Sequence, residues 1–193
     1  MRKIFTLFAF FIGSVICVLG QSIGTRFQDN GIYYQITSIN GVNGATTNEV
    51  EVTYYSTSNN SFFYQSTSYT IPQTVNYNGV NYSVTAIGNE AFKGCARPTT
   101  ILIHSGVTKI GSNAFHNCTG LTSVSIPDGV IEIGRYAFAG CTGLASINVP
   151  IGVTIIGEYA FWCCSKLTSI SIPKGVTKIA EFKMIMQQRQ IHC

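Results

Sequence analysis

VTKIGSNAFHNCTGLTSVSIPDG is the sequence of residues 107–129, and the chain repeats this unit before and after it. Three further units of 23 residues align with it without a gap, at 84–106, 130–152 and 153–175. A fifth unit begins at Val176 and fails after Ile179. Self-similarity at one fixed period is the signature of a repeat architecture, so each local motif is interpreted first as a column of this array.

Each unit contains a segment in which polar and apolar residues alternate, such as LTSVSI at 121–126. The period of two predicts a short strand with one buried face, with Val124 and Ile126 pointing inward. The same pattern predicts strands for LASINV at 144–149 and LTSISI at 167–172. A proline follows each of these strands, where its missing N–H ends the ladder, and the next glycine lets the chain turn.

The AFxxC motif lies in the other half of each unit. Ala114, Phe115 and Cys118 are spaced i, i+1 and i+4, which is typical of one or two helical turns. Gly111 precedes the motif and is interpreted as a turn glycine. One unit alone buries too little apolar surface to offset the entropy of ordering its backbone, so the units should stack. We therefore expect a solenoid with parallel strands on one face and the AFxxC turns on the other.

The pattern LxxIxIPxxVxxIGxxAFxxC resembles the leucine-rich repeats of the BspA-like family, seen in surface and secreted proteins of anaerobic bacteria and some parasitic protists. The resemblance covers residues 84–179, about half of the chain. It implies a curved α/β-type leucine-rich repeat solenoid and a role in attachment or recognition at the cell surface, and it does not imply an enzymatic activity. In the first unit Pro98 replaces the leucine and His104 replaces the proline, which suits a boundary repeat.

Residues 1–20 have the features of a secretory signal peptide. A basic start, MRK, precedes the apolar run Ile4–Val18, and a cleavage site can be placed after Gly20. The run is too short and wrongly flanked to span a bilayer, and no other segment is long and apolar enough to do so. A buried strand or helix is the alternative interpretation. The prediction is a secreted or cell-surface protein whose mature chain has no transmembrane segment.

The mature chain would be nearly neutral. Without residues 1–20, ten basic residues stand against eight acidic ones, and charged residues make up only 10% of the whole chain. A net charge of +2 without a basic cluster gives no footprint for nucleic acid, so we expect no nucleic-acid partner.

Residues 21–83 differ from the repeats in composition and hold eight of the ten tyrosines. Strands are predicted at 31–39 and 48–56, and a hairpin at 75–84 around Asn78–Gly79. The predicted role of this antiparallel segment is an N-terminal cap on the first repeat, whose strand would otherwise be a bare edge. Its aromatic side chains are interpreted as half-buried strand residues, with stacking on sugars as the alternative: Tyr33, Tyr34, Tyr54, Tyr55, Phe62, Phe63 and Tyr64.

Four cysteines share one column of the array: Cys95, Cys118, Cys141 and Cys164. At the inter-strand rise, the first and fourth sulfurs would lie about 14 Å apart, which excludes one four-cysteine zinc site. We interpret the column as a buried ladder of free thiols and expect no metal and no cofactor. Cys163 and Cys193 fall outside the column and either could pair or stay reactive. No acidic residue recurs beside His104 or His116 and no catalytic motif is present, so no enzyme activity is expected.

Two surfaces are candidates for binding an extracellular protein or glycan. The outward strand column forms an extended polar face, beginning near Thr100 and Leu102, although a soluble strand needs the same residues: Ser123, Ser125, Ser146, Asn148, Ser169 and Ser171. A second, more adhesive flank is expected in the turn region, made of Tyr136, Tyr159 and Trp162.

The tail at 180–193 abandons the repeat pattern. Ala180 stands where each earlier unit has a glycine, so a fifth unit cannot close if that position needs a positive φ. The tail could form a short helix, and the sequence suggests a truncated array whose uncapped end allows self-association. The leading hypothesis is non-catalytic binding or adhesion; a spacer without a ligand and an enzyme acting through the N-terminal segment are the alternatives.

Overall fold

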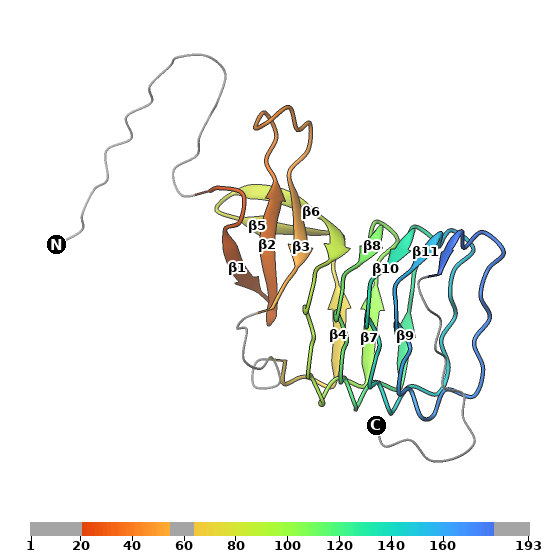
Figure 1. Cartoon of the computed structure of the whole chain (residues 1–193). Helices are drawn as coiled ribbons and strands as arrows, with labels where there is room; N and C mark the ends of the chain where they lie inside the picture. Colours follow the sequence, from red (N-terminus) through yellow and green to blue (C-terminus); the bar gives the residue numbers. More distant parts are fainter. Residues whose placement is uncertain (1–20, 55–63, 180–193) are drawn as a thin grey trace, which may run out of the picture.

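The computed structural model describes residues 21–54 and 64–179, and they form a strand-rich stack of coils with a smaller group of strands at the N-terminal side (Figure 1). The hypotheses about the signal peptide at 1–20 and the tail at 180–193 concern residues outside these ranges. Within the described ranges the chain forms no helix, so these residues contain no helix that could span a membrane.

Two tight hairpins occur among the N-terminal strands. Strands β1 (Arg26–Asp29) and β2 (Ile32–Ser38) pair antiparallel, and β2 pairs antiparallel with β3 (Glu49–Val52). Strands β5 (Thr74–Tyr77) and β6 (Val80–Ile87) form the hairpin expected around Asn78–Gly79, with φ of 51° and 82° at the two turn residues. Asn30 and Gly31, at φ 47° and 79°, make a similar two-residue turn between β1 and β2. Positive φ at both central residues is the requirement of a type I′ turn, which Asn–Gly meets.

One long sheet connects these strands to the repeats. Strand β3 pairs in parallel with β6, and the end of β6 pairs in parallel with β8 (Lys109–Ile110). The ladder then continues through strands that lie 23 residues apart, namely β10 (Glu132–Ile133), β11 (Ile155–Ile156) and β12 (Lys178–Ile179). Each repeat therefore stacks on its neighbour in register.

A second parallel sheet has the order β4-β7-β9, with β4 (Ser68–Ile71), β7 (Thr100–Ile103) and β9 (Ser123–Ser125) (Figure 1). Sequence analysis did not identify β4, which adds a strand from the N-terminal segment to the repeat sheet. The strands expected at 144–149 and 167–172 are absent. Residues 144–149 keep the alternating burial of 121–126, but they form no ladder that continues the β4-β7-β9 sheet. These coils remain joined by the β10-β11-β12 ladder and by the hydrogen bonds between their turns.

The prediction of helical AFxxC turns was wrong. Along residues 113–118 alternate N–H groups donate to the residue three positions earlier and to the next coil, as with Ala114 N to Gly111 O and Phe115 N to Ala137 O. The turn also holds left-handed residues in two columns, the first being Glu90, Asn113, Tyr136 and Tyr159 and the second Gly94, Asn117, Gly140 and Cys163. A right-handed helix cannot contain such residues, so the motif forms consecutive turns.

The glycine before AFxxC has a different role from the one expected. Gly88, Gly111, Gly134 and Gly157 do not have positive φ. A Cβ on Gly111 would lie 2.7 Å from the backbone N of Asn89, and one on Gly134 would lie 2.6 Å from the carbonyl carbon of Gly111. The column is glycine because adjacent coils touch there, backbone against backbone.

The core is a set of columns, one residue from each coil. Phe92, Phe115, Phe138 and Phe161 form a stack with ring centroids 5.3, 5.0 and 5.6 Å apart. Tyr64, from the N-terminal segment, lies on the ring of Phe92 at 4.5 Å and donates its hydroxyl to the carbonyl of Thr53 at 2.9 Å. The aromatic core is thus continuous from the N-terminal strands into the repeats.

Candidate functional site

The outward face of β7, β9 and the coil that follows them is hollowed into a groove, here called the strand-face groove. It has a volume of about 410 Å³ and is lined by Thr100, Leu102, Ser123, Val124, Ser125, Ile126, Ser146, Ile147 and Asn148. Four of the six residues proposed for the binding face therefore lie in one depression. The other two, Ser169 and Ser171, are exposed on the following coil and do not line it.

The groove has hydroxyls and one amide around an apolar floor and no charged residue in its lining. Leu102 is 48% exposed there, although Ile101 and Ile103 on the same strand are buried. Its neighbours Ser123 and Ser125 are exposed as well. This arrangement can accept and donate hydrogen bonds along an extended partner while Leu102 supplies an apolar contact, and its lining contains no acid or base that could activate a hydroxyl.

The aromatic flank lies on the turn side of the coils. The rings of Tyr136 and Tyr159 stack at 5.1 Å, and the guanidinium of Arg135 lies 4.9 Å from the ring of Tyr136. His116 contacts this pair at 6.1 Å from Tyr136. Trp162 is half-buried on the same type of turn, and no ring contact joins it to the two tyrosines within the residues described. The tyrosine pair is held by its own stacking and by Arg135.

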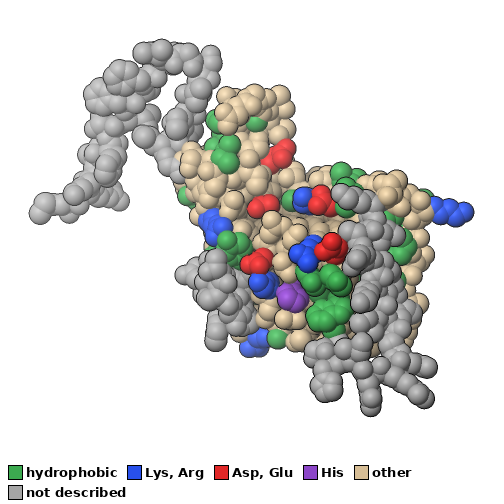
Figure 2. Space-filling model, in the orientation of Figure 1, with side chains coloured by type: hydrophobic (Ala, Val, Ile, Leu, Met, Phe, Trp, Pro, Cys, Tyr) green, Lys and Arg blue, Asp and Glu red, His purple; other side chains and the backbone are tan. Residues whose placement is uncertain are grey.

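Opposite charges on neighbouring coils accompany this flank. Lys109 and Glu132 approach to 3.0 Å, and so do Arg135 and Glu158. Figure 2 shows paired acidic and basic side chains on the repeats, with hydrophobic side chains gathered beside a histidine. All four charged groups are partly exposed, so each pair contributes at most about 1 kcal/mol and serves mainly to keep the surface polar.

The cysteine column is buried, and its thiols bond to the backbone of the preceding coil. Cys118 Sγ donates to Phe92 O at 3.0 Å, and Cys141 and Cys164 repeat the contact one coil further on. These three and Cys95 are free thiols. Burial raises the pKa of Cys95 to about 12 and that of Cys164 to about 11. The pKa values of Cys118 and Cys141 are raised for the same reason, so the thiols of this column stay protonated and unreactive at neutral pH.

Other candidates for chemistry are not assembled into a site. Cys163 is disulfide-bonded, whereas Cys193 lies outside the described residues. Desolvation lowers the pKa of His104 and His116, which lie in different parts of the coil. Across residues 21–54 and 64–179, no group of three or more potential metal ligands comes together.

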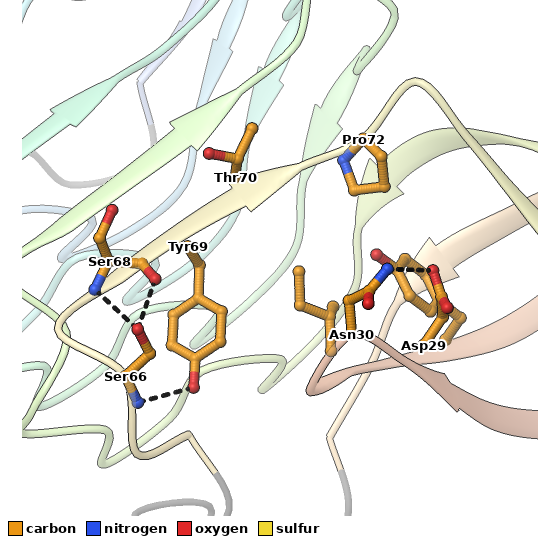
Figure 3. A pocket seen from close by; sticks show the side chains of 9 residues that line it. Asp29, Asn30, Ser66, Ser68, Tyr69, Thr70 and Pro72 are labelled. Carbon is orange, nitrogen blue, oxygen red and sulfur yellow. Dashed lines mark hydrogen bonds between the residues drawn. The ribbon is translucent and has the colours of Figure 1, made fainter.

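A second hollow, missed by sequence analysis, lies where the β1–β2 hairpin meets β4. This junction pocket has a volume of about 300 Å³ and is lined by Asp29, Asn30, Ile32, Tyr34, Ser66, Ser68, Tyr69, Thr70 and Pro72 (Figure 3). Two sequence signals could have located its walls. Asn30–Gly31 is a hairpin turn, and SYTIP at 68–72 matches SVSIP at 123–127.

Comparison with known proteins identifies the repeats. The model of the BspA type leucine rich repeat region matches residues 85–185 in six copies. The chain belongs to the BspA-type leucine-rich repeat family. This confirms the resemblance that the repeat columns indicated, and it gives the strand-rich stack the leucine-rich repeat fold.

Solved structures of bacterial leucine-rich repeat proteins are similar to this BspA-type chain. A leucine rich cell surface protein from Faecalibacterium prausnitzii has 32% identity and a TM-score of 0.61, with 79% of this chain and 38% of that one covered. A protein from Bacteroides ovatus has 32% identity and a TM-score of 0.56, with 78% and 42% covered. One from Bacteroides capillosus has 25% identity and a TM-score of 0.58, with 79% and 95% covered. The chain thus spans about two fifths of the first two proteins.

No curated protein matches the chain. The family and its structural relatives are leucine-rich repeat proteins, and they indicate no catalytic family. They suggest a surface or secreted location and a non-catalytic binding role.

Proposed function

We propose that this protein is a non-catalytic binding or adhesion protein, secreted or held at the cell surface, that recognises an extracellular protein or glycan through the strand-face groove. The observation that carries the proposal is the groove of about 410 Å³ over β7 and β9, lined by exposed hydroxyls, the Asn148 amide and Leu102. The cell-surface description of the Faecalibacterium relative supports the location.

The chemistry of the groove fits an uncharged, extended partner. Parallel coils place the same hydroxyl-bearing positions side by side, so hydrogen-bonding groups recur along the stack. A protein loop in extended conformation and a linear glycan both offer donors and acceptors at regular intervals. The aromatic flank of Tyr136 and Tyr159 is a second candidate surface, since stacked tyrosines are common anchors in interfaces.

We also propose that the N-terminal strands cap a leucine-rich repeat solenoid. Strand β3 covers the edge of β6, and Tyr64 covers the end of the phenylalanine stack at Phe92. Without them, the first coil would present an open sheet edge and an uncovered aromatic ring.

A binding screen with groove-filling variants tests the binding proposal. The full chain is screened against immobilised extracellular matrix proteins and a glycan array, and any saturable partner is then tested with Ser125→Tyr and Ser146→Tyr. These substitutions put a large ring into the groove from exposed positions and should weaken binding at least tenfold. Ser105→Tyr, on an exposed turn outside the groove, is the matched control and should bind normally.

The spacer alternative makes the opposite prediction. A folded chain that binds nothing saturably in the screen would favour a structural role. Binding that both groove variants retain would move the site to another surface, with Tyr136→Ala and Tyr159→Ala as the next variants.

A further inference from the structure

The junction pocket has two walls that come from segments far apart in the sequence. One is the tip of the β1–β2 hairpin, where Asn30 Nδ2 donates to Asp29 Oδ2 at 3.1 Å. The other is the chain leading into β4, where Ser66 N donates to the hydroxyl oxygen of Tyr69 at 3.0 Å. Figure 3 shows the Asp29–Asn30 pair on the opposite side of the pocket from Ser66, Ser68 and Tyr69. The pocket exists only because β4 extends the repeat sheet beside this hairpin.

One of the residues that line this pocket, Tyr34, has a buried hydroxyl without a partner. The Tyr34 side chain is fully buried, and its hydroxyl forms no hydrogen bond. Burial and the charge of Asp29 both raise the pKa of Tyr34, so the hydroxyl keeps its proton and remains available as a donor. Buried polar groups in native proteins almost always have partners, and an exception calls for an explanation such as a ligand. A bound group with an acceptor oxygen would satisfy it.

The other polar groups of the lining favour a neutral ligand rich in hydroxyls. Asp29 contributes acceptors, Asn30 both kinds of group, and Ser68 and Thr70 hydroxyls that can donate or accept. The oxygen of Tyr69 accepts from Ser66 N, which leaves its own proton free to be donated. The ring of Tyr69, Ile32 and Pro72 provide apolar surface between these groups.

Charge and size exclude other classes of ligand. The lining contains the carboxylate of Asp29 but no Lys or Arg, and this balance of charge disfavours ligands that carry a phosphate or carboxylate group. Asp29 is also the only acidic lining residue, too few for a divalent cation that needs six or more oxygen ligands. A volume of about 300 Å³ lies at the small end of ligand pockets and suits a ligand of one ring.

We propose that the junction pocket binds one pyranose unit of a neutral glycan, with Asp29, Asn30 and the Tyr34 hydroxyl holding its hydroxyl groups and Tyr69 contacting its apolar face. This site is separate from the strand-face groove and does not depend on it. The two lie on the same sheet, since Ser68 and Thr70 of β4 are the positions that pair with Thr100 and Leu102 of β7. A longer glycan whose end occupies the pocket would therefore run toward the groove.

The test uses the full chain and four simple sugars. Methyl glycosides of glucose, galactose, mannose and N-acetylglucosamine are titrated and followed by saturation-transfer NMR and by the shift in melting temperature. At least one should bind saturably, with a Kd on the order of millimolar, as expected for a ligand of this size. Tyr34→Phe removes only the hydroxyl and should weaken this binding about fivefold or more, the equivalent of one hydrogen bond. Asp29→Ala should weaken it at least as much.

Controls separate this site from the groove and from misfolding. Ser125→Tyr, which fills the groove, should leave binding of the simple sugars unchanged. Tyr34→Phe without sugar should melt at or above the temperature of the unsubstituted chain, because it removes a hydroxyl that has no partner. The proposal is overturned if no sugar binds saturably up to about 100 mM, far above a millimolar Kd. It is also overturned if binding occurs but Tyr34→Phe binds equally well.

Discussion

Substituting Gly134 by alanine tests the claim that the glycine column exists for backbone contact. The added Cβ would lie 2.6 Å from the carbonyl carbon of Gly111 and from the amide nitrogen of Ser112, where ordinary contact begins at 3.4 Å. The two coils would have to separate locally by about 0.8 Å. The bond from Gly134 N to Ile110 O, now 2.8 Å long, would then leave hydrogen-bond range.

The expected cost is at the upper end of the range for overpacking, about 3 kcal/mol, because backbone atoms cannot rotate away as a side chain can. For a chain of this size, the melting temperature should fall by about 6–12 °C, as measured by circular dichroism. Gly175→Ala is the matched control, since its Cβ would meet only Ile151 O at 3.4 Å. It should be neutral or slightly stabilising through the unfolded chain. A melting temperature of Gly134→Ala within 2 °C of that of Gly175→Ala would refute the contact argument.

Three other predictions concern the columns. Phe115→Ala removes a ring stacked on both sides and should lower the free energy of unfolding by about 3–5 kcal/mol, whereas the exposed Ser123→Ala should change it by less than about 0.5 kcal/mol; urea denaturation measures both. The pKa values of the buried cysteines are raised in the folded chain above the ordinary 9.0, so the stability that depends on protonated thiols is present below pH 9 and is lost as the pH rises through 11 to 12. The melting temperature should therefore decrease over this pH window. A chain with all four column cysteines replaced by alanine should show a smaller decrease. Lys109→Ala should cost less than about 1 kcal/mol in urea, because its ion pair with Glu132 is partly exposed, and a larger loss would assign this pair a structural role.

The repeat columns could be predicted from the sequence because the same buried residue types recur at a fixed spacing. Leu121, Phe115 and Cys118 recur at 23-residue spacing and are all buried, and the ring of Phe115 stacks on its counterparts in both neighbouring coils, so one unit explains the others. The AFxxC turn could not be predicted correctly in the same way. Its apolar spacing fits a helix equally well, and the left-handed φ of Asn113 and Tyr136 has no reliable sequence signal, since tyrosine rarely adopts it.

Strand β4 and the junction pocket were missed because an insertion breaks the period. Sixteen positions separate Pro72 from Gly88, against seven between the matching Pro127 and Gly134. The extra residues form the β5–β6 hairpin, so the segment containing β4 did not align with the array. The strand-face residues were placed on one surface by alternation alone, but the sequence contains no signal that this surface is hollow between Leu102 and Asn148.

The hydrogen bonds that join neighbouring turns have a mechanical consequence. Phe115 N bonds to Ala137 O, and Phe138 N bonds to Ala160 O, so each coil is fastened to the next by the same set of bonds. A pulling force applied along the chain would break one such set at a time rather than the whole stack at once. Each 23-residue coil that detaches would release about 80 Å of chain. Such a molecule would yield in equal steps under tension and dissipate the load coil by coil.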